Sequence, residues 1–176
     1  MNDRYDRKTI ALHWLTAILI IGLWCVGQSI DWFPSGTPRV WVRSMHILFG
    51  SVLAFVFAYR LWWRISAGTK LPPASVGWQQ TLAKSMHHFL YLLIAATVLL
   101  GLFNTWVRGD NVFDFFTLPS FAPGDKAFRH QIEDIHALAA NILLAVAALH
   151  AAAALVHHFI FKDAVLKRML MSGTEK

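Results

Sequence analysis

Four long apolar runs constrain this chain more than any other feature of its sequence. Each run is long enough to cross the ~30 Å hydrocarbon core of a bilayer as a helix. The runs lie at about residues 10–30, 45–63, 88–107 and 135–161. The chain is 56% hydrophobic and only 15% charged, against the ~25% charge that is typical of a soluble domain. The sequence therefore predicts an all-α integral membrane four-helix bundle, formed by a single domain over residues 1–176.

Lysine and arginine are unevenly distributed between the two ends of this predicted bundle. With the spans threaded in order, eleven of the 16 lie on the side of the N-terminus and five on the opposite side. Because positive loops stay in the cytoplasm, both termini are expected to be cytoplasmic, in a bacterial inner membrane. Contact with anionic lipid then accounts for the net charge of +6, and no nucleic-acid partner is expected. The five outer residues are Arg39, Arg43, Arg108, Lys126 and Arg129.

Two histidines on the fourth run point to a bound cofactor. His136 and His150 stand fourteen residues apart, so that both imidazoles leave the same helix face, with Cα atoms roughly 21 Å apart. Threading the spans places His46 at the outer depth of His136 and His13 at the inner depth of His150. Each pair joins two helices, which is what two-histidine ligation of a haem requires. The spacing therefore predicts two haems, stacked across the bilayer.

A single membrane histidine has a second explanation, since an imidazole can simply hydrogen-bond to a neighbouring helix. Ionisable groups inside a membrane are costly, however, and tend to mark functional sites. Four histidines that pair by depth favour ligation over packing. Cys25 is the only cysteine, which excludes a C-x-x-C-H attachment motif, so the haems are expected to be b-type. A haem iron with two histidine ligands has no open position and transfers electrons.

Further residues lie near these helix faces. Arg60 follows His46 by fourteen residues and is expected to meet a haem propionate, although it could instead snorkel to the inner headgroups. His157 follows His150 by seven residues and could donate to a quinone carbonyl or a propionate, or remain a surface residue. His87, near the start of the third span, is a further quinone candidate. Gly50, one turn after His46, leaves room for a flat macrocycle, and no internal repeat is evident.

Histidine motifs spread over nearly the whole chain carry a family resemblance. They are His13-Trp14, His46 with Gly50 and Arg60, His87 with Tyr91, the pair His136 and His150, and the tail Leu149–Asp163. Together they resemble the bacterial di-haem cytochrome b561 family, and most of all its superoxide oxidase type. The resemblance implies that His13 and His150 hold the inner haem and that His46 and His136 hold the outer one. It also implies ubiquinone as the acceptor, near the cytoplasmic end of the fourth span, where His157 and Lys162 match.

Two functions are compatible with this resemblance. The first is a superoxide:ubiquinone oxidoreductase, which oxidises superoxide at the periplasmic side and passes the electrons through both haems to ubiquinone. The five outer basic residues are candidates for attracting the superoxide anion. Six acidic residues share that side, so any attracting field must be local. The alternative is a cytochrome b membrane anchor that relays electrons between a hydrogenase or dehydrogenase partner and quinone. A histidine-lined transporter without haem is a third option, which the pairing of the histidines by depth disfavours.

Overall fold

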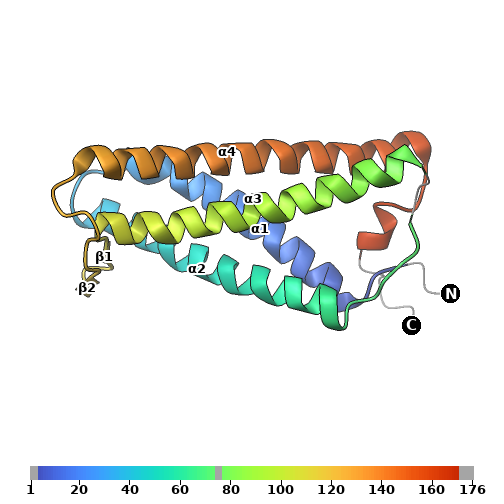
Figure 1. Ribbon diagram of the computed structural model, residues 1–176, viewed down its shortest axis with the longest axis horizontal. Helices are drawn as coiled ribbons and strands as arrows, with labels where there is room; N and C mark the ends of the chain where they lie inside the picture. The colour runs from blue at the N-terminus through green and yellow to red at the C-terminus, as the bar shows by residue number, and fades with distance from the viewer. Residues whose placement is uncertain (1–3, 74–76, 171–176) are drawn as a thin grey trace.

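In the part of the chain that the structure describes, four long helices form an elongated bundle, with the first and last described residues at one end and a small β-hairpin at the other (Figure 1). The computed structural model describes residues 4–73 and 77–170. The long helices are α1 Arg7–Ser29, α2 Thr37–Ser66, α3 Trp78–Arg108 and α4 Lys126–Val156. The short elements are the 3₁₀ turns η1 Ile30–Trp32 and η3 Lys167–Met169, the π-helical turn η2 His157–Phe161, and the strands β1 Asn111–Val112 and β2 Phe116–Thr117. All four long helices are apolar enough to cross a membrane, which confirms the predicted membrane bundle.

Local interactions explain where several helices begin and end. Asp6 caps α1, since its carboxylate accepts hydrogen bonds from the backbone N–H of Thr9 at 2.9 Å and from its hydroxyl at 2.6 Å. Asp125 caps α4 by accepting a hydrogen bond from the backbone N–H of Phe128 at 2.9 Å. α3 ends at Gly109, whose left-handed φ of 65° is one that glycine adopts without strain.

The helices extend beyond the predicted spans. α2 begins at Thr37 rather than near residue 45, and α3 begins at Trp78 rather than near residue 88. α4 begins at Lys126 rather than near residue 135, and the last predicted turn of that span is the π-helical η2. The physical reason is that a helix keeps its backbone groups paired as it passes through the headgroup region, whatever its side chains. His87 consequently lies well inside α3.

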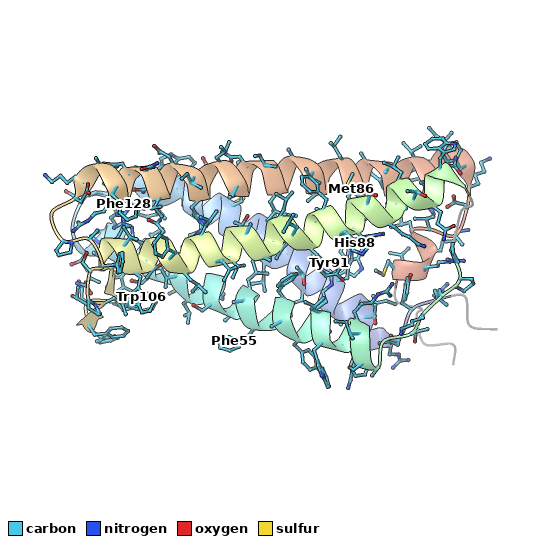
Figure 2. The ribbon with its side chains drawn as sticks, viewed as in Figure 1. Phe55, Met86, His88, Tyr91, Trp106 and Phe128 are labelled. Atoms are coloured by element: carbon cyan, nitrogen blue, oxygen red, sulfur yellow. The ribbon has the colours of Figure 1, made fainter. Side chains whose placement is uncertain are left out.

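Large apolar side chains face outward from the bundle. Phe55 is 79% exposed and Leu99 is 66% exposed, and Figure 2 shows Phe55 projecting away from α2. The buried apolar side chains include Ile10, Leu53, Ile94, Val107, Ile132 and Leu143. Exposed apolar area is unfavourable in water by roughly 25 cal/mol per Å² but not in hydrocarbon. The outer surface of the bundle is therefore suited to lipid.

The bundle consists of two helical hairpins. α1 packs along α2 and α3 packs along α4, while α2–α3 and α1–α4 contacts join the hairpins. A hydrogen bond inside the membrane contributes to that joint, because the indole N–H of Trp24 in α1 donates to the side-chain oxygen of Asn141 in α4 at 2.8 Å.

The long connection between α3 and α4, at the end of the bundle that the sequence predicts to be the outer one, is anchored on α2. Strands β1 and β2 pair antiparallel, with Asn111 opposite Thr117 and Val112 opposite Phe116. The hydroxyl of Ser44, which is fully buried, accepts a hydrogen bond from the Phe113 N–H at 2.8 Å. The outer ends of α2 and α3 are therefore tied together by a short β-hairpin that the sequence did not predict.

The last described segment of the chain lies at the opposite end of the bundle. After η2 the segment that contains η3 lies against the start of α1, where the indole N–H of Trp14 donates to the carbonyl of Met169 at 2.8 Å. Arg168 donates to the carbonyl of Pro72 at 2.8 Å, which fastens the same segment to the α2–α3 connection. These contacts bring α1 and the α2–α3 connection together at η3.

Candidate functional site

At the outer depth of the bundle, His46 from α2 faces His136 from α4. Their ring centres lie 6.2 Å apart and their ring planes meet at 87°. The Nδ1 atom of each ring is buried. Ionisable side chains inside a membrane tend to mark functional sites, so two imidazoles that face each other from different helices indicate a binding site.

At the inner depth, His13 from α1 faces His150 from α4 in nearly the same way. Their ring centres lie 6.3 Å apart, with an angle of 71° between the planes. A third imidazole, that of His87 from α3, lies 5.3 Å from the ring of His150. The structure thus brings together both histidine pairs that the depth argument predicted, and it adds His87 to the inner layer.

The separations within the two pairs fit a metal atom held between the rings. An imidazole nitrogen binds a first-row metal at about 2.0 Å, and the ring centre lies roughly 1.2 Å farther on. Two imidazoles on opposite sides of one metal would therefore have ring centres about 6.4 Å apart. The observed separations of 6.2 Å and 6.3 Å are close to this value. The residues present fit two bis-histidine sites of the kind that haem occupies.

A cavity surrounds the outer pair and takes its walls from all four long helices. Gly27, Gly50 and Gly101 line it together with His46 and His136. A Cβ added to Gly50 would meet nothing within 4 Å, so that part of the wall is open beside the His46 imidazole. The cavity can therefore receive a flat apolar group between the two rings.

Arg60 reaches the inner pair. Its Nη2 atom lies 3.0 Å from Nδ1 of His13, and its guanidinium carbon lies 5.3 Å from the ring centre of Tyr91, which Figure 2 marks on α3. Because a guanidinium only donates, Nδ1 of His13 accepts and the hydrogen of the ring is on Nε2. A His13 that binds a metal through Nε2 carries its hydrogen on Nδ1 instead, which would release Arg60 to another acceptor.

A charged rim joins the outer cavity to a pocket on the surface, because Arg43, Arg108, Asp110 and Glu133 line both. Arg108 donates to Glu133 at 2.7 Å and to Asp110 at 3.3 Å. Arg43 lies 3.9 Å from the same oxygen of Asp110. Burial raises the pKa of Asp110, although Arg108 and Arg43 pull it down. The rim is thus an ion-paired ring around a carboxyl that is costly to ionise.

The surface pocket collects most of the predicted outer basic residues. Lys126 and Arg129 line it together with Arg43 and Arg108. We call the surface pocket and the charged rim together the charged mouth. Arg39 lies apart from it. It pairs with Asp31 at 3.3 Å and donates to the carbonyl of Phe33 at 2.8 Å, so that it fastens the α1–α2 connection.

His157 and Lys162 flank the π-helical turn at the inner end. Nδ1 of His157 hydrogen-bonds with the carboxylate of Asp163. Slight burial raises the pKa of Asp163, but the hydrogen bond with His157 and the Val165 N–H outweigh it and hold that pKa below its ordinary value. Lys162 is exposed and has a left-handed φ of 55°. π-Helical turns are frequent at functional sites, which makes this end of α4 a second candidate site.

Three residues at these sites were not singled out from the sequence. They are Gly27 and Gly101, which pack against the outer imidazoles, and Asp163, which holds His157. A signal for the glycines is present, since Gly27 follows His13 and Gly101 follows His87 by fourteen residues each. No comparable signal marks Asp163, because the chain reverses at Lys162 to bring it back.

Comparison with known proteins is consistent with this geometry. A family model described as prokaryotic cytochrome b561 matches residues 4–172. Cytochrome b561 homolog 1 of Escherichia coli K12 is 31% identical over 172 residues, which cover 96% of this chain and 97% of that protein. Cytochrome b561 homolog 2 of the same organism is 29% identical over 174 residues, covering 96% and 92%. A Yersinia pestis protein named "Probable superoxide oxidase CybB" is 28% identical over 176 residues, covering 97% of each chain. The chain therefore belongs to the prokaryotic cytochrome b561 family of multi-pass membrane proteins, which bind b-type haem and transfer electrons.

Proposed function

We propose that the protein is a superoxide:ubiquinone oxidoreductase, which oxidises superoxide to dioxygen at its periplasmic end and reduces ubiquinone at its cytoplasmic end. The observation that carries this proposal is the charged mouth, where four residues line both a basic surface pocket and the cavity around His46 and His136. An anion drawn into the pocket would arrive beside the outer histidine pair. The name of the Yersinia pestis relative supports the same activity.

The proposed cofactors are two haem b groups. His46 and His136 would hold the outer one, and His13 and His150 the inner one. The number of haems rests on the two ring separations, 6.2 Å and 6.3 Å. When bound, haem with two histidine ligands supplies one-electron transfer without an open coordination position. Arg60, released from His13, would neutralise a haem propionate at the inner depth.

The reaction balances with two superoxide anions for each quinone. Each superoxide loses one electron and leaves as dioxygen, and ubiquinone takes two electrons and two protons to become ubiquinol. His157 would move one of these protons at its Nε2 atom, since its Nδ1 atom is engaged by Asp163. Lys162 and His87 would complete the quinone site, with Lys162 donating to a quinone carbonyl.

Attraction of the anion would be local. The mouth holds four basic residues, Arg43, Arg108, Lys126 and Arg129, against the two acidic residues Asp110 and Glu133. A cleft lined mostly by one sign of charge raises the local concentration of oppositely charged substrate. The excess of basic residues is confined to the charged mouth. It is therefore compatible with the outer side as a whole, on which acidic residues slightly outnumber basic ones.

A membrane anchor for a hydrogenase or dehydrogenase is a second candidate, which the aromatic outer loops favour. Phe115, Phe116 and Phe121 are 83%, 56% and 70% exposed. Such rings could sit at the headgroup level or contact a partner protein. A partner docked there would cover the charged mouth.

Rapid mixing of the purified haem-loaded protein with superoxide tests the proposal. We expect the haems to be reduced by superoxide, and one ubiquinol to form for every two superoxide anions consumed. Arg43→Gln and Lys126→Gln should each slow haem reduction severalfold. Lys84→Gln, which removes an exposed positive charge at the other end, is the matched control and should leave that rate unchanged. Haems that superoxide does not reduce, in a protein that co-purifies with a dehydrogenase-like partner, would favour the anchor.

A further inference from the structure

The two helical hairpins share one pattern of chemically distinctive residues. In each hairpin a histidine on the first helix is followed after fourteen residues by a glycine, and a histidine on the second helix is followed after fourteen residues by a basic residue. The first hairpin has His13, Gly27, His46 and Arg60, and the second has His87, Gly101, His136 and His150. The pattern is confined to these positions, and no wider sequence repeat accompanies it.

At the outer depth, the contacts repeat along with the spacing. A Cβ built on Gly27 would lie 3.2 Å from Cε1 of His46, and a Cβ built on Gly101 would lie 2.9 Å from Cε1 of His136. In both hairpins, therefore, the glycine of the first helix receives the outer imidazole of the second helix. Two independent close approaches of the same kind are unexpected for incidental helix packing.

At the inner depth, the fourth residue of each pattern approaches the first. Arg60 lies 3.0 Å from His13 in the first hairpin, and the ring of His150 lies 5.3 Å from that of His87 in the second. His87 is thus the counterpart of His13, and Arg60 is the counterpart of His150. Because a guanidinium does not bind a metal, the inner layer is asymmetric. His13 can pair with His150 across the hairpins, but His87 faces no equivalent ligand.

We propose that both hairpins use the same arrangement, in which a glycine of the first helix positions the outer histidine of the second. Gly27 is the positioning residue for His46, and Gly101 is the positioning residue for His136. The missing side chains let the imidazoles of His46 and His136 lie against α1 and α3, which sets the 6.2 Å separation of their ring centres. The proposal rests on the haem ligation proposed above. Gly101 is the stricter position, since heavy atoms of real side chains essentially never approach within 3.0 Å of a Cβ.

Another glycine of the bundle supplies a matched control. A Cβ added at Gly22, which is also in α1, would meet nothing within 4 Å. Gly22→Ala therefore introduces the same methyl group in the same helix as Gly27→Ala without meeting an imidazole. Any effect common to both variants would come from the helix backbone and not from the histidine.

Haem content and the electron paramagnetic resonance of the oxidised haems test the proposal in the purified protein. We expect Gly101→Ala to lose the outer haem, with its resonance, and to leave the inner resonance unchanged. Gly27→Ala, whose contact is looser, should retain the outer haem with a shifted resonance. Gly22→Ala should match the unaltered protein. A Gly101→Ala protein that keeps both haems and an unshifted outer resonance would overturn the proposal.

A second comparison keeps this result separate from the ligation itself. If His136→Ala retains the outer haem, the proposed ligand set is wrong. If His136→Ala loses the haem, Gly101→Ala introduced into that background should cause no further fall in melting temperature, because the imidazole that the methyl group would meet is gone. An equal fall in both backgrounds would show that the methyl group disturbs helix packing, and would overturn the positioning role.

Discussion

Asp110 at the outer mouth shows how burial and pairing compete at a single residue. It is only 7% exposed, and burial raises its pKa even though Arg108 and Arg43 lie beside it. A carboxyl whose pKa is higher in the folded chain than in the unfolded chain binds its proton more tightly when folded. Its contribution to stability is therefore present at low pH and is lost as the pH rises through the raised pKa.

We predict that Asp110→Asn, which resembles the protonated carboxyl, matches the unaltered protein in stability below about pH 4 and is the more stable of the two at about pH 7. Melting temperatures of the two proteins in detergent across this range measure the difference. Asp114→Asn, at an exposed carboxylate of the same loop, is the control. A difference that shrinks with rising pH would show that pairing with the arginines outweighs burial.

Asp163 illustrates the opposite case, since its hydrogen bond with His157 helps hold its pKa low. Asp163→Asn removes the anion that fixes the His157 ring, so we predict a several-fold loss of the quinone-reduction rate. Reduction of the haems by superoxide should not change, because the proposed superoxide site lies at the other end of the bundle. Measuring the two half-reactions separately checks this. Equal slowing of both steps would contradict a local role for Asp163.

At the scale of elements, the sequence predicts helices better than it predicts their ends or contacts. An apolar run of this length can pair its own backbone groups in hydrocarbon only by forming a helix, so all four helices could be predicted. Their starts at Thr37 and Trp78 could not, because polar residues continue a helix without an apolar signal. Depth alone predicted which histidines meet. The glycine contacts were missed, because small residues are common at any membrane helix interface and only the fold shows which ones face an imidazole.

The joint between the two hairpins can be tested through the bond from Trp24 to Asn141. An amide without a partner is unfavourable in hydrocarbon, and such interhelical bonds contribute about 0.6 kcal/mol on average and up to about 1.7 kcal/mol. We predict that Trp24→Phe and Asn141→Ala each destabilise the bundle, and that the double variant loses less than the sum of the two. Reversible unfolding of the four proteins in mixed detergent gives the coupling energy. Strict additivity would show that the bond contributes nothing to the joint.

At the scale of the whole molecule, every proposed step depends on which way the bundle faces. The start of α1 and the turn η3 lie at the end opposite the β-hairpin (Figure 1). Eleven of the 16 lysines and arginines are on the side of the N-terminus, which predicts a cytoplasmic location for that end. The charged mouth would then open to the periplasm, where it can receive an anion that does not cross the membrane, and η2 would lie near cytoplasmic protons.

Single-cysteine labelling in a Cys25→Ser background tests this orientation. Thr117 in β2 and Gln79 at the start of α3 are both exposed and lie at opposite ends of the bundle. We predict that a membrane-impermeant maleimide applied to intact spheroplasts labels Thr117→Cys and leaves Gln79→Cys unlabelled until the membrane is opened. Because both cysteines would be reached after lysis, lysed cells provide the control for reactivity. The reverse pattern would place the charged mouth in the cytoplasm, where the proposed periplasmic oxidation of superoxide could not occur.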